Sequence, residues 1–103
     1  MSKQDDVLDK VLKTSKFLVD SLIPESFLDT REPSDMYSQR HFMMGRVINV
    51  EIVVTDYQLS GIIVGVGGRN AHAIRTILKS IAAQHRYKCM MSVSTPLQNE
   101  VKA

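Results

Sequence analysis

Cysteine is almost absent from this 103-residue sequence, in which Cys89 is the single example. A lone cysteine excludes an intramolecular disulfide and a metal site built from cysteines, and it fits a reducing compartment. No run of 18 apolar residues occurs, and the first six residues show neither the apolar stretch nor the cleavage site of a signal peptide. We therefore expect a cytoplasmic protein without a membrane partner. The burial preference of free cysteine predicts that Cys89 is a small, buried strand residue.

Acidic residues are missing from a long part of the chain. Ten of the eleven Asp and Glu residues lie at or before Asp56, and residues 57–99 contain none. The same stretch carries basic residues, namely Arg69, Arg75, Lys79, Arg86 and Lys88. Unopposed positive charge of this kind is typical of a site for a polyanion, although five charges also fit an ordinary solvated surface.

Catalytic and metal-binding patterns are also missing. His41, His72 and His85 are not at metal-ligand spacing, no Ser or Cys stands on a nucleophile turn, and no pair of carboxylates lies near the glycines of residues 65–68. We expect no catalytic residue, no bound metal and no cofactor, so the sequence predicts a protein that is not an enzyme. Its length suits one small domain, and its apolar fraction of 44% is that of an ordinary globular chain.

The composition divides the chain into four segments. Residues 1–24 read as an N-terminal amphipathic helix that packs on a sheet, with apolar residues at helical spacing from about Asp5 to Ile23 and Pro24 as the stop. Residues 25–36 are rich in Pro, Ser, Asp and Thr and are predicted to be a loop. Residues 37–95 form the core of the fold, and residues 96–103 are predicted to be a flexible tail.

The core is predicted to contain two strands, two helices and a final strand. β-branched residues between Tyr37 and Thr55 indicate a hairpin, with a shorter strand around 40–44 and a turn at Gly45. Asp56 is a good N-cap for a short helix that follows it. A longer helix is predicted from about Arg69 to His85, and an alternating strand from 87 to 94.

Glycines interrupt the two helices at Gly65-Val66-Gly67-Gly68. Because glycine has no Cβ, a polyanion can approach the main chain there, and the first-turn N–H groups of the next helix have no partner inside that helix. The motif therefore suggests binding of a phosphate group. A Walker loop is excluded because no Lys follows until Lys79, and a dinucleotide fingerprint is excluded because Asn70 stands where its third glycine belongs. The spacing and the flanking helices fit the remaining device, a Gly-x-x-Gly loop that clamps about four nucleotides of a single strand.

The run Val64–Lys79, followed by the pair Ala82-Ala83, resembles the heart of a KH domain and is similar to the small bacterial single-KH RNA-binding proteins. The resemblance is strong from about Val50 to Val93. It implies an α+β, type II KH fold in the order α-β-β-α-α-β, with a three-stranded sheet packed against helices and residues 37–95 as the KH core. It also implies a non-catalytic RNA chaperone or post-transcriptional regulator. The expected partners are single-stranded RNA and either a second copy of the chain, in a homodimer, or a larger KH-containing RNA-binding protein.

The resemblance also implies a set of site residues. The RNA backbone would pass over Gly65, Val66, Gly67 and Gly68, held by main-chain amides and by Arg69. Arg75 and Lys79 would extend the positive strip. The bases would lie on an apolar groove floored by Ile62, Ile63, Val64, Ile74 and a residue of the neighbouring strand such as Ile52 or Val54. Taken singly, these aliphatic residues also fit a plain core.

One feature of the loop departs from the family pattern. Its two variable positions usually include a basic or polar residue, and here they are Val66 and Gly67. The charge-assisted phosphate contact is therefore missing from the loop itself, and Arg69 and Asn70 are the candidates to replace it. We expect weak, strongly salt-dependent RNA binding with little sequence selectivity. The alternative is a KH-fold module that serves mainly for dimerisation or protein interaction, with weak or lost RNA binding.

Overall fold

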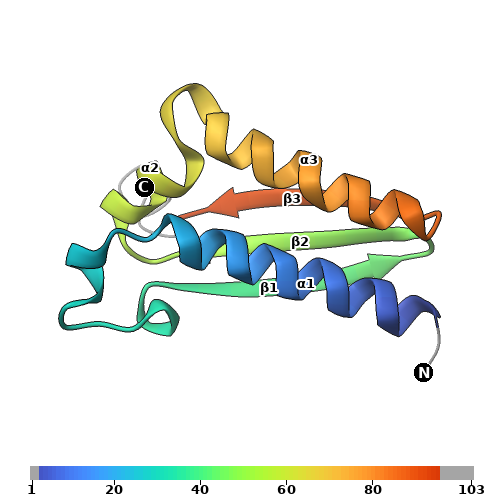
Figure 1. Cartoon of the computed structure of the whole chain (residues 1–103), viewed down its shortest axis with the longest axis horizontal. Coiled ribbons are helices and arrows are strands. Elements are labelled where there is room, and N and C mark those ends of the chain that lie inside the picture. The colour runs from blue at the N-terminus through green and yellow to red at the C-terminus, as the bar shows by residue number, and fades with distance from the viewer. Residues whose placement is uncertain (1–2, 96–103) are drawn as a thin grey trace, which may run out of the picture.

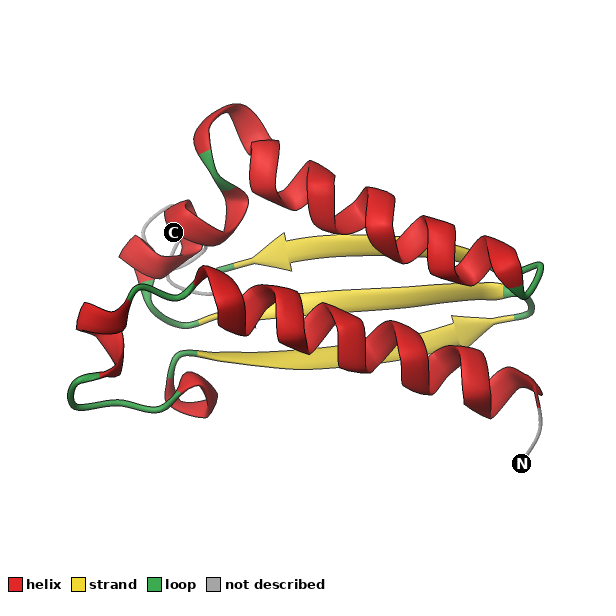
Figure 2. Ribbon diagram, in the orientation of Figure 1, coloured by secondary structure: helices red, strands yellow, loops and turns green. Residues whose placement is uncertain are grey.

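A three-stranded mixed sheet forms one layer of the fold, and two long helices form the other (Figure 1). The computed structural model describes residues 3–95. Strand β1 (Tyr37–Met44) is antiparallel to the central strand β2 (Val47–Val54), which is parallel to β3 (Lys88–Ser94). Helices α1 (Lys3–Leu22) and α3 (Arg69–Gln84) lie side by side over one face of the sheet (Figures 1 and 2). The predicted α+β class and the three-stranded sheet are confirmed.

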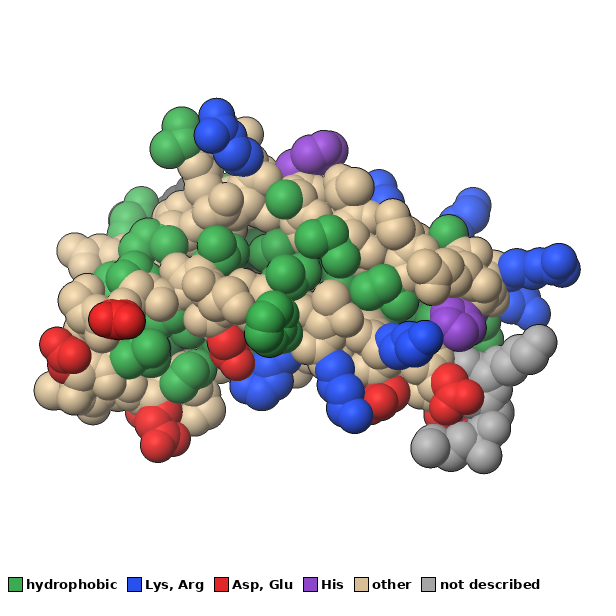
Figure 3. Space-filling view, viewed as in Figure 1, with side chains coloured by type: hydrophobic (Ala, Val, Ile, Leu, Met, Phe, Trp, Pro, Cys, Tyr) green, Lys and Arg blue, Asp and Glu red, His purple; other side chains and the backbone are tan. Residues whose placement is uncertain are grey.

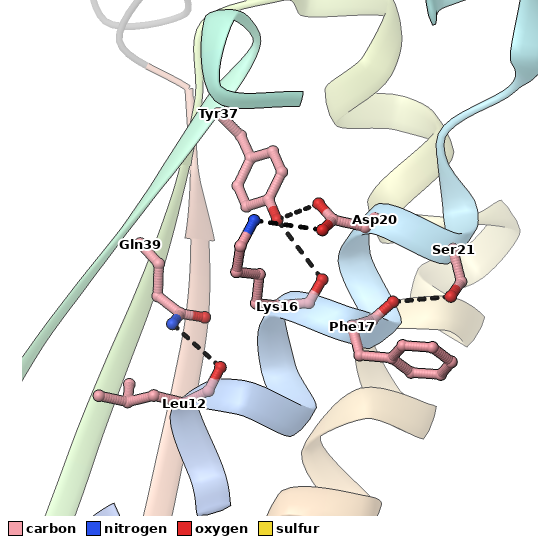
Figure 4. A network of polar contacts seen from close by, with 7 residues as sticks. All are labelled: Leu12, Lys16, Phe17, Asp20, Ser21, Tyr37 and Gln39. Atoms are coloured by element: carbon pink, nitrogen blue, oxygen red, sulfur yellow. Dashed lines mark hydrogen bonds and ion pairs between the residues drawn. The ribbon is translucent and has the colours of Figure 1, made fainter. Parts of the chain in front are cut away.

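Helix α1 is fixed to the sheet by an apolar face and by polar contacts at its edge. Val7, Val11 and Val19 lie on one face of the helix and are fully buried in the core. On the β1 side, Tyr37 donates its hydroxyl hydrogen to the Asp20 carboxylate, and the Gln39 amide donates to the carbonyl of Leu12 at 3.2 Å (Figure 4). Strand β1 begins at Tyr37, three residues before the strand predicted from the sequence, because Tyr37 and the residues after it pair with the end of β2.

The segment between α1 and β1 is more ordered than the predicted loop. Two short 3-10 turns, Glu25–Leu28 and Pro33–Asp35, lie within residues 25–36. The second is stabilised by a capping box between Glu32 and Asp35, with Pro33 at a position where its missing N–H costs nothing. The composition predicted a loop and did not reveal these two turns.

Helix α2 (Tyr57–Val64) leaves the end of β2 and carries the chain to the glycines. The predicted N-cap is confirmed, because one carboxylate oxygen of Asp56 accepts a hydrogen bond from the Leu59 amide at 3.0 Å. The other oxygen pairs with the Arg31 guanidinium at 2.8 Å. One side chain therefore fixes both the start of α2 and the preceding segment.

Strand β3 closes the sheet at the edge beside α3. Cys89 and Met91 point into the core and are buried, and the prediction that Cys89 is a buried strand residue is confirmed. None of the helices within residues 3–95 is long and apolar enough to cross a bilayer. The predicted tail, residues 96–103, lies outside the described residues.

Replacement of Asp56 tests how firmly α2 is anchored. The Leu59 amide and then Arg31 lower the pKa of the Asp56 carboxyl, so its contribution to stability is present above the unfolded pKa of about 4 and is lost as the pH falls through the folded pKa. We expect Asp56→Ala to reduce the free energy of unfolding by about 1 kcal/mol at pH 7, with a smaller difference at pH 3. Chemical denaturation at both pH values measures this.

Asp56→Asn is the matched control for that experiment. Asparagine is an equally good N-cap, so this variant should lose the pairing with Arg31 but retain most of the stability that Asp56→Ala loses. Equal losses in the two variants, or a loss from Asp56→Ala that does not change with pH, would contradict this account of the cap.

Candidate nucleic-acid interface

The connection from α2 to α3 is a tight turn made possible by glycine. Gly65, Gly67 and Gly68 have φ values of 80°, 64° and 78°, a region that other residues rarely adopt. Within the turn, the Gly68 amide donates to the carbonyl of Gly65 at 3.0 Å. The remaining loop residue, Val66, is 91% exposed. The predicted Gly-x-x-Gly segment is therefore a protruding turn with an accessible main chain.

Asn70 closes this turn from the side of α3. Its side-chain amide donates to the carbonyl of Ile62 at 2.9 Å, near the end of α2. A Cβ added to Gly65 would lie 2.9 Å from Cγ of Asn70, too close for a real contact. Asn70 was predicted to contact RNA in place of a loop cation; its bond to Ile62, which joins the two helices, uses one of the two hydrogens of its amide. Asn70 therefore has a structural role, because its side chain joins the start of α3 to the end of α2.

A shallow hollow of about 440 Å³ lies beside the turn. It brings together the predicted site residues Ile62, Gly65, Val66, Arg69 and Asn70. Gln58 and Gly61 of α2 also line it, and the sequence analysis did not include them. Gln58 lies three residues before Gly61, and Gly61 lies four residues before Gly65. This spacing places them on the same side of α2 and is the signal that identifies them.

The first turn of α3 faces this region with positive polarity. No side chain caps the helix, and its first turn contains no acidic residue. The Arg69 amide donates a hydrogen bond to the carbonyl of Val66. The next amides of the first turn have no acceptor inside the helix. The partial positive charge of a helix N-terminus favours an anion at this position. The exposed guanidinium of Arg69 adds a full charge beside it.

Arg75 and Lys79 continue the positive charge along α3, one turn apart. Nε of Arg75 donates to the carbonyl of Met91 at 2.9 Å, which places its guanidinium at the edge of β3 and leaves the other nitrogens free to donate. Within residues 3–95, neither these two residues nor Arg69 forms an ion pair with a carboxylate. Figure 3 shows Lys and Arg side chains at both ends of the upper rim, where no Asp or Glu side chain is visible.

The predicted apolar groove is largely wrong. Ile63, Ile74, Ile52 and Val54 are buried in the core. They expose little surface to bases, because their side chains fill the space between the helices and the sheet. Ile62 and Val64 are half-buried and keep some accessible surface. Beside the turn, Ile62, Val64 and the exposed Val66 offer apolar surface, and a smaller hollow between α1 and α3 reaches Asn70.

The conformation of Gly65 can be tested by alanine substitution. We expect Gly65→Ala to reduce the free energy of unfolding by on the order of 2–4 kcal/mol, because it combines an unfavourable φ with a clash against Asn70. Gly61→Ala is the control, because its added Cβ meets no atom within 4 Å. This second change should raise stability by about 0.5–1 kcal/mol, as expected for a glycine inside a helix. Thermal or urea unfolding measures both variants. Changes of the same sign in the free energy of unfolding would contradict the assignment.

The groups at this site are suited to binding an anion. They comprise main-chain amides, a helix N-terminus and guanidinium groups, all of which donate hydrogen bonds or carry positive charge. No group of three or more His, Cys, Asp or Glu residues in the described part of the chain is placed to hold a metal ion. Comparisons of the chain with protein-family models, curated proteins and solved structures found no match.

Proposed function

We propose that this protein is a non-catalytic, single-stranded RNA-binding protein with a type II KH fold. The observation that carries the proposal is the glycine turn 65–68, which leads directly into the N-terminus of α3. No side chain caps this end of the helix, and Arg69 beside it forms no ion pair within residues 3–95. The succession of helices and strands around this turn, and a mixed sheet with β2 at its centre, support the KH assignment. We further propose that it acts in the bacterial cytoplasm as an RNA chaperone or post-transcriptional regulator, without a cofactor.

In this mechanism the RNA backbone passes over the glycine turn. Added side-chain atoms would meet nothing at Gly67 and Gly68, so the space above them is open to a phosphate group. The helix N-terminus and Arg69 supply the positive charge that the neutral loop lacks. The bases then contact the aliphatic surface of Ile62, Val64 and Val66. This arrangement binds any sequence, because contacts to the backbone position a strand without reading it.

Acidic substitution in the turn tests the phosphate clamp. We expect the double variant Gly67→Asp, Gly68→Asp to reduce affinity for a short single-stranded RNA at least tenfold, because two carboxylates would stand where a phosphate binds. Fluorescence anisotropy at low salt measures the Kd. Unchanged affinity of this variant, or no binding by the unmodified protein, would sink the proposal.

The double variant Gly67→Asn, Gly68→Asn is the matched control. Asparagine has the shape of aspartate and tolerates a positive φ, so it introduces the same backbone strain without the charge. The asparagine variant should retain most of the affinity. A loss equal to that of the aspartate variant would assign the effect to the conformation of the turn and would contradict electrostatic repulsion.

Arg69 is expected to contribute one phosphate contact. Arg69→Gln should weaken binding to all RNA sequences alike and should reduce the slope of log K against log salt by about 0.7 for a single strand. Lys10→Gln, on the exposed side of α1, removes the same charge away from the site and should leave the slope unchanged. An equal change in both variants would mean that only the net charge matters.

A second candidate function, dimerisation, is favoured by the uncovered face of the sheet. Alternate residues of the strands point away from the helices, and at the hairpin end they are Phe42, Met44 and Met90, which are 58%, 67% and 61% exposed. Exposed apolar side chains gathered in one place indicate a protein contact. We propose a second copy of this chain, or a larger KH-containing protein, as the partner. Light scattering of the protein and of the double variant Phe42→Ser, Met90→Ser tests the homodimer. A homodimer should become a monomer in the double variant, whereas a protein that is already monomeric should not change.

A further inference from the structure

A second basic pocket lies at the other end of α3, remote from the glycine turn. It has a volume of about 410 Å³ and is lined by Arg46, Gln84, His85, Arg86 and Tyr87. Arg46 comes from the turn between β1 and β2, whereas the other four residues form the end of α3 and its connection to β3. Residues 40 positions apart in the sequence therefore line one hollow. Figure 1 shows the turn between β1 and β2 beside the connection from α3 to β3.

The backbone of this pocket is held in an unusual conformation. Arg86 has a φ of 63° and is the non-glycine residue with a positive φ in the described part of the chain. The Arg86 amide donates to Ala83 and the Tyr87 amide to Ala82, so the last carbonyls of α3 already have partners. The Lys88 amide donates to the carbonyl of Arg46 at 2.8 Å and ties the two segments together. The pocket is thus fixed by main-chain contacts, and the charges of its side chains are not needed to build it.

Among the described residues, the cations of the pocket have no acidic partner. The Arg46 guanidinium lies 4.9 Å from the centre of the Tyr87 ring, and one of its nitrogens is 3.5 Å from the carbonyl of Arg86. Stacking uses the flat face of a guanidinium and leaves its N–H edge available for an anion. Arg86 and Lys88 are exposed. None of these cations forms an ion pair with a carboxylate within residues 3–95.

We propose that this pocket is a second phosphate-binding site, occupied by the RNA strand that the glycine turn holds. The inference rests on the proposed function. Helix α3 has 16 residues, so the two sites are separated by about 24 Å along it. Arg75 and Lys79 project from the helix between them. At about 3.4 Å per stacked nucleotide, a strand that reaches both sites needs about seven nucleotides, which is longer than the four held by the turn alone.

The test compares a 4-nucleotide RNA with a 12-nucleotide RNA by fluorescence anisotropy. The pocket variant is Arg46→Gln, Arg86→Gly, in which glycine suits the positive φ of Arg86. We expect affinity for the longer RNA to fall on the order of tenfold and its salt slope to fall by about 1.4, since two phosphate contacts are lost. Affinity for the shorter RNA should stay within about twofold, which also shows that the variant is folded.

Lys10→Gln, Lys13→Gln removes two charges from α1 and is the matched control, expected to change neither affinity. Equal weakening by the control and the pocket variant, or unchanged binding of the longer RNA by the pocket variant, would overturn the second site. If the second site is overturned in this way but the double variant Gly67→Asp, Gly68→Asp still binds both RNAs more weakly, only this inference fails. If that variant weakens neither, the proposed function fails. Inorganic phosphate could instead raise the unfolding temperature of the protein while the pocket variant leaves the affinity for RNA unchanged. That result would assign the pocket to free phosphate and overturn the RNA assignment.

Discussion

The turn between α2 and α3 reverses the chain within four residues, and its geometry depends on one close approach. Gly65 comes so near to Asn70 that no Cβ fits between them, and the Asn70 amide holds the carbonyl of Ile62. This contact holds the start of α3 against the end of α2. The buried face of α3 packs in the core, and its first turn lies beside the hollow. The core and the candidate site therefore share one constraint.

Several acidic side chains of the N-terminal half form structural hydrogen bonds and ion pairs. Asp20 holds Tyr37, Glu51 pairs with Arg40, and Asp56 pairs with Arg31 while capping α2. These carboxylates stabilise the N-terminal half of the fold and the start of α2. From α2 to the end of β3 the chain has no acidic residue, so the cations along α3 keep their charge unopposed. A field of one sign along a single helix attracts polyanions over a distance set by salt, which is about 10 Å at 0.1 M.

Local rules were sufficient for some of these features and insufficient for others. The N-cap at Asp56 depends on neighbouring residues and the burial of Cys89 follows the general preference of free cysteine, so the sequence alone predicts both. Helical spacing also identified the apolar side of α3, but it does not say how much of that side another element covers. The resemblance to KH domains implied that Ile63 of α2 and Ile74 of α3 floor a groove, whereas both lie in the buried core. The bonds of Asn70 to Ile62 and of Arg75 to Met91 join separate elements, and their existence depends on helix angles that no local pattern encodes.

The burial of those isoleucines bears on how RNA would be recognised. Beside the turn, the hollow offers bases the aliphatic surfaces of Ile62 and Val66 and the side-chain amide of Gln58. Aliphatic side chains cannot distinguish bases by hydrogen bonding, and a single exposed amide provides little discrimination against competing sequences. The favourable free energy of binding must then come mainly from phosphate contacts, which are the same for every sequence. With cations at both ends of α3, affinity in the proposed mechanism depends more on the length of an accessible single strand than on its bases. Such a binder would distinguish unpaired RNA from short or fully paired RNA, which suits the role of a chaperone better than that of a sequence-specific regulator.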